Sequence, residues 1–282
     1  MRLIGVDAPQ GPMIAVVRDE LVQPLTSVES FYADVDGWLA KAEALTPGGT
    51  SVSSVRQVPF VPGSAKVLCV GLNYLNHASE ASMDLPEYPT VFGRWTSTLV
   101  VDGAPIPVPD HEDGLDWEVE LAVVVGRRLT DASEEQAQAA ILGYSAFNDV
   151  SARRRQFESA QWTLGKNADF SAPIGPVMVT ADEWDGTPDL ALETRVNGEV
   201  MQSSRTSSMI FSPAAILSYI SKTTTLEPGD VIATGTPEGV GFVRTPARLL
   251  VEGDLLESSV ESIGTLRNPI AGSAQRHPNQ RP

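Results

Sequence analysis

Two glutamates separated by one residue stand at the start of an apolar run. Glu118 and Glu120 precede residues 121–125, an unbroken apolar segment that predicts a strand buried on both faces. Side chains two positions apart in a strand point the same way, so both carboxylates share one face with Asp116. Like charges in such a place repel one another and lose solvation, and they persist where a cation holds them. A solvated strand end is the ordinary alternative.

A third acid follows on a segment that also carries an arginine and a glutamine. Asp149, Arg153 and Gln156 are spaced at i, i+4 and i+7, which predicts a narrow stripe on one helix face. Alone, this spacing is that of an ordinary intrahelical ion pair. Beside the two clustered glutamates it indicates a hard-metal site flanked by substrate-binding groups. The chain has only three histidines and one cysteine, and an all-oxygen ligand set suits Mg²⁺, Mn²⁺ or Ca²⁺.

A histidine and a glutamate three positions apart form a second candidate group. On a helical turn, the side chains of His77 and Glu80 can hydrogen-bond. A carboxylate on one imidazole nitrogen fixes the tautomer and raises the basicity of the other nitrogen. For an arbitrary His-x-x-Glu, a weak surface pair is the more frequent explanation.

Length, composition and charge describe an ordinary globular chain with an acidic balance. The 282 residues suffice for one large domain, or for one domain with a small companion, and 42% of them are apolar. A formal net charge of −16 argues against nucleic acid and anionic membranes as partners. The lone Cys69 rules out an internal disulfide and lies in an apolar run, as a packed thiol does. With no signal-peptide or membrane-span pattern, we expect a cytoplasmic protein.

Local patterns predict a small N-terminal domain at 1–60, a main domain at 61–271 and a disordered tail at 272–282. The first contains a strand pair at 3–6 and 13–17 and a helical segment at 31–45, and a strand at 66–72 opens the second. Ser133 and Gln136 form a capping box that begins a helix, which we expect Gly143 to end.

Later segments add a hairpin, a helix and three strands. Asn197-Gly198 predicts a type I′ turn, and Ser212-Pro213 predicts the start of a helix at 214–221. Apolar runs at 230–236, 248–251 and 255–260 predict strands. Many short strands with few helices indicate a β-rich α+β fold.

In their order, these motifs resemble the fumarylacetoacetate hydrolase superfamily, and in particular its acylpyruvase and 2-hydroxyhepta-2,4-diene-1,7-dioate isomerase members. The matching segments are VGLNY at 70–74 with His77 and Glu80, DWEVEL at 116–121, NDVSAR at 148–153 with Gln156, WTLGK at 162–166, PIGP at 173–176, NG at 197–198, PGDVIATGTP at 228–237 and GTLRN at 264–268. Each motif alone is modest, but eight in the family's order are specific.

The resemblance implies a metal site and a fold. Glu118, Glu120 and Asp149 correspond to the family's three metal ligands, and Lys166 corresponds to its catalytic lysine beside the metal. The implied cofactor is Mg²⁺ or Mn²⁺, with Ca²⁺ as a further candidate. The implied fold is a β-roll of mixed sheets behind a small N-terminal α/β domain, usually in a homodimer.

The resemblance also implies which residues meet the substrate and the attacking water. Arg153 and Gln156 correspond to substrate contacts, and Thr236 lies in a loop that binds a carboxylate. His77 and Glu80 correspond to a catalytic dyad that activates water. One departure concerns residues 92–95 (FGRW), which stand where many members have Phe-x-Lys. It alters the pocket wall and leaves the distal group of the substrate open.

The implied activity is metal-dependent hydrolysis of a carbon–carbon bond in a 2,4-dioxo acid, such as an acylpyruvate or fumarylpyruvate, in aromatic or sugar catabolism. A metal ion can stabilise the enolate that leaves, and Lys166 adds positive charge where an oxyanion develops. Isomerisation or decarboxylation of a related 2-oxo or 2-hydroxydienoate acid is an alternative, because the same enolate chemistry serves all three. A non-catalytic dimeric metal-binding scaffold is the alternative from another class, and retained clustered acids argue against it.

Overall fold

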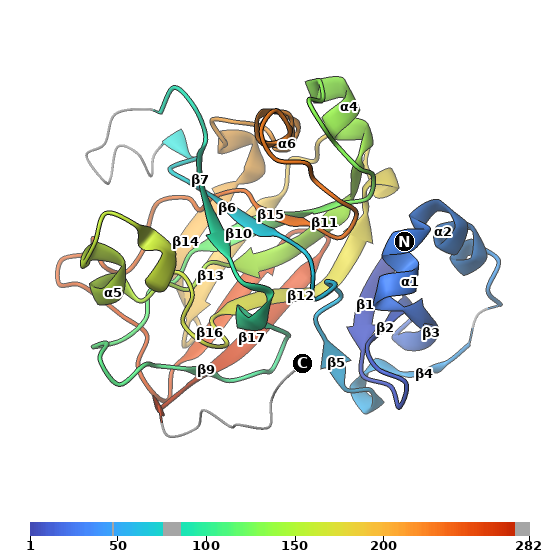
Figure 1. The fold of residues 1–282 in the computed structure, drawn as a ribbon. Coiled ribbons are helices and arrows are strands. Elements are labelled where there is room, and N and C mark those ends of the chain that lie inside the picture. Colours follow the sequence, from blue (N-terminus) through green and yellow to red (C-terminus); the bar gives the residue numbers. More distant parts are fainter. Residues whose placement is uncertain (47, 76–85, 274–282) are drawn as a thin grey trace.

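The strands form two sheets in the computed structural model, which describes residues 1–46, 48–75 and 86–273 (Figure 1). The twelve-stranded sheet runs in the order β4-β3-β2-β1-β12-β11-β10-β15-β6-β7, with β5 on β1 and β8 on β12. Its strands are β1 (Arg2–Val6), β2 (Met13–Arg18), β3 (Leu21–Ser27), β4 (Thr50–Ser51), β5 (Gln57–Val58), β6 (Val67–Gly71), β7 (Thr90–Arg94), β8 (Leu99–Val100), β10 (Val119–Val125), β11 (Ile141–Asn148), β12 (Ala172–Thr180) and β15 (Val231–Ala233).

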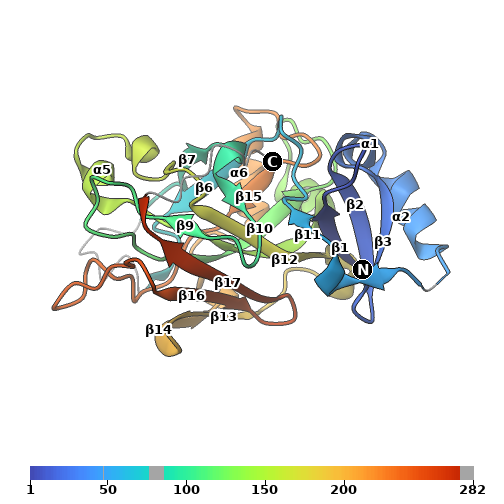
Figure 2. The same cartoon turned by 90° about the horizontal axis from the view of Figure 1, so that it is seen from below.

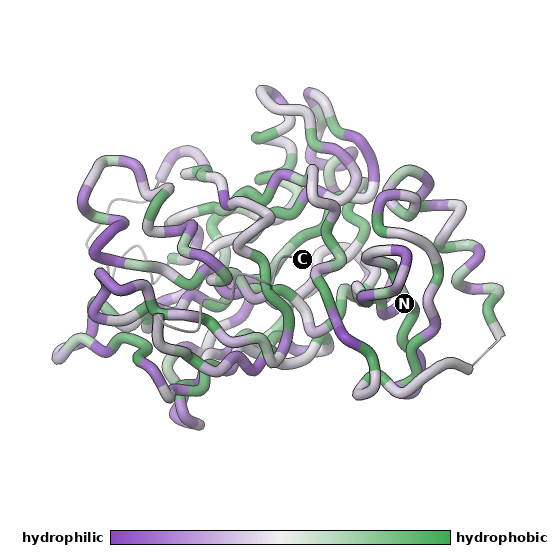
Figure 3. The backbone as a smooth tube through the Cα atoms, turned by 60° about the horizontal axis from the view of Figure 1, so that its bottom comes forward, coloured by the Kyte–Doolittle hydropathy of each residue, from purple (hydrophilic) through white to green (hydrophobic). Residues whose placement is uncertain are grey.

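A five-stranded sheet forms a second layer against β11 and β12 (Figure 2). Its order is β14-β13-β16-β17-β9, and its strands are β9 (Ile106–Pro107), β13 (Ala191–Val196), β14 (Glu199–Arg205), β16 (Leu255–Val260) and β17 (Gly264–Ala271). Leu192, Val260 and Leu266 from this sheet share one apolar core with Val123 of β10. Figure 3 shows hydrophobic residues concentrated along the inner strands and hydrophilic ones in the peripheral loops.

The helices are short and lie around the sheets. The α-helices are α1 (Val28–Ala33), α2 (Val35–Glu43), α4 (Glu134–Ala139), α5 (Arg153–Phe157) and α6 (Pro213–Ser221). The 3₁₀ helices are η1 (Val52–Ser54), η2 (Thr96–Thr98), η3 (Trp162–Leu164), η4 (Ala181–Glu183) and η5 (Thr206–Ser208). Among the described residues, no helix is both long and apolar enough to cross a membrane.

The strand that carries the two glutamates lies in the middle of the large sheet. All seven residues of β10 are buried, as the apolar run predicts. It pairs antiparallel with β11, where Leu121 faces Ala146, and with β15, where Val123 faces Ile232. Because both edges are hydrogen-bonded and both faces are covered, β10 is a rigid base for the polar groups at its start. Cys69 on nearby β6 is fully buried, which confirms the packed thiol.

The N-terminal strands continue the large sheet. β1 pairs with β12 through Arg2–Val179 and Leu3–Met178, and α1 and α2 lie over β1–β3 at the side of the molecule (Figure 1). The predicted strand pair is confirmed as β1 and β2, but the predicted single helix is two helices. They are separated at Asp34, whose side chain caps α2 by accepting from Gly37 N at 3.1 Å. The boundary at residue 60 stays a prediction, as does the disordered tail, because residues 274–282 are outside the described residues.

Several local predictions are confirmed. The hairpin between β13 and β14 turns at Asn197 and Gly198, which have φ angles of 53° and 83°. The side chain of Ser212 caps α6 by accepting from Ala215 N. The capping box of Ser133 and Gln136 begins α4.

Two local predictions are wrong. The helix begun at Ser133 ends near Ala139, and Gly143 lies inside β11 instead of capping that helix. A Cβ atom at Gly143 would lie 2.3 Å from the carbonyl oxygen of Val179, so close packing of two strands explains the glycine. The predicted strand at 248–251 is a loop that contains one isolated bridge, between Leu250 and Leu115.

Candidate metal centre and substrate pocket

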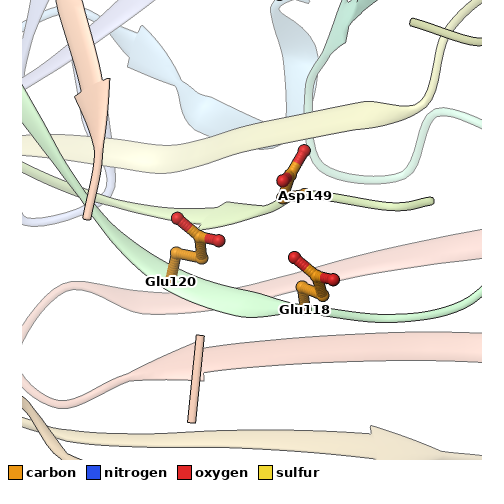
Figure 4. A group of neighbouring side chains, drawn as sticks. All are labelled: Glu118, Glu120 and Asp149. Atoms are coloured by element: carbon orange, nitrogen blue, oxygen red, sulfur yellow. The ribbon is translucent and has the colours of Figure 1, made fainter. Parts of the chain in front are cut away.

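Three carboxylates meet at the ends of two paired strands. Glu118 precedes β10, Glu120 is its second residue, and Asp149 follows the last residue of β11. Antiparallel pairing brings them together, and the backbone N–H of Asp149 donates to the carbonyl of Glu118 at 2.9 Å. One oxygen from each carboxyl group lies within 4.8 Å of the others, and all three side chains are buried (Figure 4). We call these three residues the acid triad.

The predicted helix stripe is wrong for one of its members. α5 begins at Arg153, so Asp149 lies in the extended connection between β11 and α5. The backbone there is fixed by a bridge in which Asp116 and Ser151 exchange two hydrogen bonds of 2.8 and 3.0 Å. The remaining pair of the stripe is present, since Arg153 Nη1 donates to Gln156 Oε1 at 2.9 Å. Asp149 therefore reaches the triad by strand pairing and not by helical periodicity.

Lys166 lies directly against the acid triad. Its Nζ contacts Glu118 Oε2 and Asp149 Oδ2, each at 2.7 Å, and the side chain is almost fully buried. Burial lowers the pKa of Lys166, but the charges of Asp149 and then Glu118 raise it, and the net shift is upward. Lys166 therefore remains an ammonium group at neutral pH.

Two arginines hold the other carboxylate oxygens. Arg94 forms a buried ion pair with Asp149 and donates from Nη2 to Ser171 Oγ at 2.5 Å. The sequence reasoning noted Arg94 only as part of the pocket wall and missed this contact. Arg153 Nη2 lies 2.6 Å from Glu118 Oε1. A separation of 55 residues between Arg94 and Asp149 gives no local signal of their pairing.

Asp116 supports the arginine and not the acid triad. Its Oδ2 accepts from Arg153 Nε at 2.8 Å, and its Oδ1 accepts the backbone N–H groups of Trp117 and Gly241 at 2.9 and 2.6 Å. The expectation that Asp116 shares a face with the two glutamates is therefore too simple, because its carboxylate binds Arg153 and the backbone of residues 117 and 241. Its carboxylate fixes the position of Arg153 and of the loop that contains Gly241.

Glu120 differs from the other two members of the acid triad. It accepts the backbone N–H of Gly235 at 2.7 Å, and among the described residues it forms no ion pair. Burial, followed by the charges of Asp149 and Glu118, raises the pKa of Glu120 well above its ordinary value. Gly235 has φ of +99°, and a Cβ there would lie 2.7 Å from Asn73, so this turn requires glycine.

The charge balance and donor chemistry fit a divalent cation. The charged cluster consists of four carboxylates and three cationic side chains, namely Asp116, Glu118, Glu120, Asp149, Arg94, Arg153 and Lys166. With all of them ionised, one negative charge is left over in a buried place. Three carboxylates with neighbouring oxygens form the hard, oxygen-only donor set that Mg²⁺ and Mn²⁺ prefer. A divalent ion would convert the excess into one positive charge.

A cavity of about 320 Å³ opens beside the acid triad. Its polar wall contains five of the predicted residues, Glu118, Arg153, Gln156, Lys166 and Thr236. The remaining lining is apolar and comprises Val70, Gly71, Leu72, Phe92, Phe157, Trp162, Phe242 and Val243. The structure therefore brings together eight of the ten groups that the sequence singled out around the site, counting Asp116. His77 and Glu80 lie outside the described residues.

Thr236 lies on the loop after β15 and is held by contacts with β10 and β14. Its hydroxyl donates to the carbonyl of Val119 at 3.0 Å and accepts from Gln202 Nε2 at 2.9 Å. Gln202 also accepts the N–H of Val119 at 3.1 Å, which ties β14 to the start of β10. Gln202 is a supporting residue that sequence reasoning missed, because nothing in β14 marks it as a neighbour of β10.

Fold and site together define a class: β-rich α+β enzymes with a buried carboxylate triad for a divalent metal, open to a pocket for a small molecule. The family model described as "Fumarylacetoacetate (FAA) hydrolase C-terminal" matches residues 66–271. The chain belongs to this family and is one of its enzymes. The matched range contains all eight motifs, which lie between residues 70 and 268.

Several similar proteins have names of the tautomerase or isomerase kind. The chain is 37% identical over 222 residues to the mitochondrial oxaloacetate tautomerase fahd2 of Xenopus laevis, covering 78% of this chain and 70% of that protein. The solved 2-hydroxyhepta-2,4-diene-1,7-dioate isomerase of Mycobacterium marinum is 34% identical with a TM-score of 0.76, covering 98% and 100%. A Mycobacterium smegmatis structure with the provisional assignment HpcE is 33% identical with a TM-score of 0.89, covering 97% and 100%. The expected β-rich α+β fold of the family is confirmed.

Proposed function

We propose that this enzyme catalyses the keto–enol tautomerisation, or the related double-bond isomerisation, of a small 2-oxo acid with the help of Mg²⁺ or Mn²⁺. The observation that carries the proposal is the acid triad beside a cavity, with Lys166 in contact with two of its three carboxylates. The names of the tautomerase and isomerase relatives support this reaction class over carbon–carbon hydrolysis, which the motifs alone favoured.

The acid triad would hold the metal through Glu118, Glu120 and Asp149. When bound, the ion supplies Lewis acidity to the carbonyl group and charge for a developing enolate. Lys166, kept as an ammonium by its two carboxylate neighbours, places a second positive charge at the same end of the pocket. A tautomerisation moves one proton between the carbon beside the carbonyl and the carbonyl oxygen, and it consumes no water.

Two further predicted residues are placed to orient the substrate. Because Oε1 of Gln156 accepts from Arg153, the amide nitrogen of Gln156 is the group that its side chain can present to a substrate in the cavity. Thr236 lines the same wall on the loop that the family resemblance assigns to a carboxylate. We propose that these two residues contact the carboxylate end of the 2-oxo acid.

Enol decay separates the competing reactions. The enol form of oxaloacetate or phenylpyruvate is added to the magnesium-loaded protein, and the loss of enol absorbance is followed together with CO₂ release and, for oxaloacetate, pyruvate release. We expect faster enol loss without either product. Products that appear as fast as the enol is lost would establish decarboxylation, and cleavage of an acylpyruvate with no tautomerisation would establish hydrolysis.

Hydrolysis has an additional requirement. It needs an activated water, and the sequence assigned that task to His77 and Glu80, outside the described residues. If His77→Ala abolishes acylpyruvate cleavage but leaves enol decay at the parent rate, the two chemistries separate in one protein.

The homodimer also stays a proposal, which sedimentation tests by distinguishing one 30.1 kDa chain from two. The cytoplasmic location stays a prediction. The similar tautomerase of Xenopus laevis is named as mitochondrial.

A further inference from the structure

We infer that the substrate group beyond the 2-oxo acid is apolar, with an aromatic ring as the preferred occupant, and is not a second carboxylate. This inference rests on the proposed function, because it specifies the substrate class of the same pocket. It also predicts a difference from relatives whose names refer to dicarboxylates.

Two aromatic pairs line the cavity. Phe92 and Trp162 pack edge to face with ring centres 5.5 Å apart. Phe157 and Phe242 pack in a tilted arrangement at 5.6 Å. All four rings line the cavity, and with Val70, Leu72 and Val243 they make its non-polar wall. We call these four side chains the aromatic wall.

The aromatic wall lies close to the cationic side chains of the cavity. Lys166 Nζ lies 5.4 Å from the centre of the Phe92 ring, and the Arg153 guanidinium lies 4.5 Å from that of Phe242. A small acid bound at Lys166 therefore projects its next substituent toward these rings.

A glycine on β6 allows one ring to reach its place. A Cβ atom at Gly71 would lie 2.7 Å from Cζ3 of Trp162, so a side chain at that position would push the indole out of the cavity wall. The absence of a side chain at Gly71 therefore leaves room for the indole ring of Trp162. The half-buried Trp162 and its partner Phe92 present flat apolar surface to the cavity.

The cations that line the cavity are already engaged. Among the described lining residues these are Lys166 and Arg153. Lys166 contacts two carboxylates of the acid triad. Each nitrogen of Arg153 faces an acceptor: Nε faces Asp116, Nη1 faces Gln156 and Nη2 faces Glu118. A second substrate carboxylate would lose its hydration among the rings, and neither cation of the described lining is uncommitted to replace it.

The net charge of the charged cluster also favours a monocarboxylate substrate over a dicarboxylate. With a divalent ion, the charged cluster carries one net positive charge, which matches the single negative charge of a 2-oxo monoacid. A dicarboxylate would leave an excess negative charge in a buried pocket within a chain whose formal charge is −16. An aromatic substituent gains from burial and from edge contacts with the four rings.

Binding of unreactive analogues tests the inference without any turnover. Oxanilate and N-oxalylglycine share an oxamate head and differ in carrying a phenyl ring or a carboxymethyl group. Calorimetric titration of the magnesium-loaded protein should show oxanilate binding at least tenfold more tightly. Equal affinities, or tighter binding of N-oxalylglycine, would overturn the inference.

Variants of the aromatic wall test whether these rings cause the preference for oxanilate over N-oxalylglycine. Trp162→Ala should lower oxanilate affinity about tenfold and leave N-oxalylglycine nearly unchanged, while Val243→Lys should raise N-oxalylglycine affinity. Trp184→Ala is the matched control, because Trp184 also packs edge to face on an aromatic ring, Tyr144 at 5.6 Å, but does not line the cavity. If Trp184→Ala changes the affinity ratio as much as Trp162→Ala, the preference does not come from the wall.

Turnover of a second matched pair distinguishes this inference from the proposed function. Phenylpyruvate and oxaloacetate share the 2-oxo acid head and differ in a phenyl or carboxylate group at the third carbon. We expect the larger kcat/KM for enol–keto conversion of phenylpyruvate. A preference for oxaloacetate would overturn the inference and keep the tautomerase, whereas oxanilate binding without turnover of either acid would overturn the tautomerase and keep the inference.

Discussion

The two ends of the cavity are built on different principles. At the charged end, buried side chains from widely separated segments each make several contacts, as Lys166 does with Glu118 and Asp149. At the aromatic end, the rings come from short helices, an edge strand and a loop, and Phe157 is 57% exposed. The charged end is therefore fixed by many mutual constraints, whereas the aromatic end can change without disturbing it. On this comparison, the charged end serves the reaction and the aromatic end selects the substrate.

Removing the metal should give the largest effect. Chelation should abolish turnover, and Mg²⁺ or Mn²⁺ should restore it, because the acid triad is the oxygen-rich group at the reacting end. Turnover is measured before chelation, after it and after metal addition, with Ca²⁺ as a comparison. Full activity in a verified metal-free sample would contradict the assignment of the triad and with it the division between the two ends.

The two glutamates of the acid triad should respond differently to neutralisation. Glu118→Ala removes one of the two carboxylate partners of Lys166 and of Arg153, and breaking a buried pair costs up to about 3–5 kcal/mol. Glu120→Gln keeps an acceptor for Gly235 N–H and removes a repelling charge, so the metal-free variant should melt at or above the parent temperature.

Both variants should bind Mg²⁺ much more weakly than the parent. Thermal melting of the metal-free proteins and calorimetric metal titration measure the two effects separately. The comparison fails if Glu120→Gln is the less stable of the two.

Lys166→Met tests the charge at the reacting end with little change in size. Loss of a preorganised positive group should lower kcat on the order of 10²–10³. Metal affinity should be retained or increased, because the variant no longer places a cation against Glu118 and Asp149. Both quantities are measured on the same preparation. A parent-like kcat with weakened metal binding would make Lys166 a structural residue only.

A buried and an exposed ion pair provide a smaller contrast. Asp116→Asn disturbs an acceptor of Arg153 and of three backbone N–H groups, and we expect a loss of about 1–3 kcal/mol in the free energy of unfolding. Asp36→Asn is the control, because Asp36 pairs with Arg127 on the surface, where such pairs contribute about 0–1 kcal/mol. Denaturant titration of both variants gives the comparison. Equal losses would show that the Asp116 network does not fix the charged end.

The aromatic end should show the smallest effect on stability and activity. Phe157→Leu removes one ring of a pair that contributes about 0.5–1.5 kcal/mol, so oxanilate affinity should fall by about two- to tenfold. The melting temperature and metal affinity should remain close to those of the parent, because the ring is largely exposed. A large loss of metal affinity in this variant would show that the two ends are coupled after all.

The sequence by itself determined the features that depend on short-range geometry. The apolar run after Glu120 indicated a buried strand, and the spacing of Glu118 and Glu120 put both carboxylates on one side, because alternation in a strand is a property of the chain. The turn at Asn197-Gly198 and the helix start at Ser212 followed from local backbone preferences in the same way. The ordered motifs were enough to predict the family.

Tertiary structure decided which charges meet and which do not. Asp149 joins the acid triad through pairing of β10 with β11, although its spacing to Arg153 suggested a helix. Arg94 pairs with Asp149 from 55 residues away, while Glu120 receives a backbone N–H and no cation within the described chain. Sequence periodicity cannot specify such contacts, because they depend on strand order and on where loops bring distant segments together. The same long-range packing placed the aromatic wall beside Lys166.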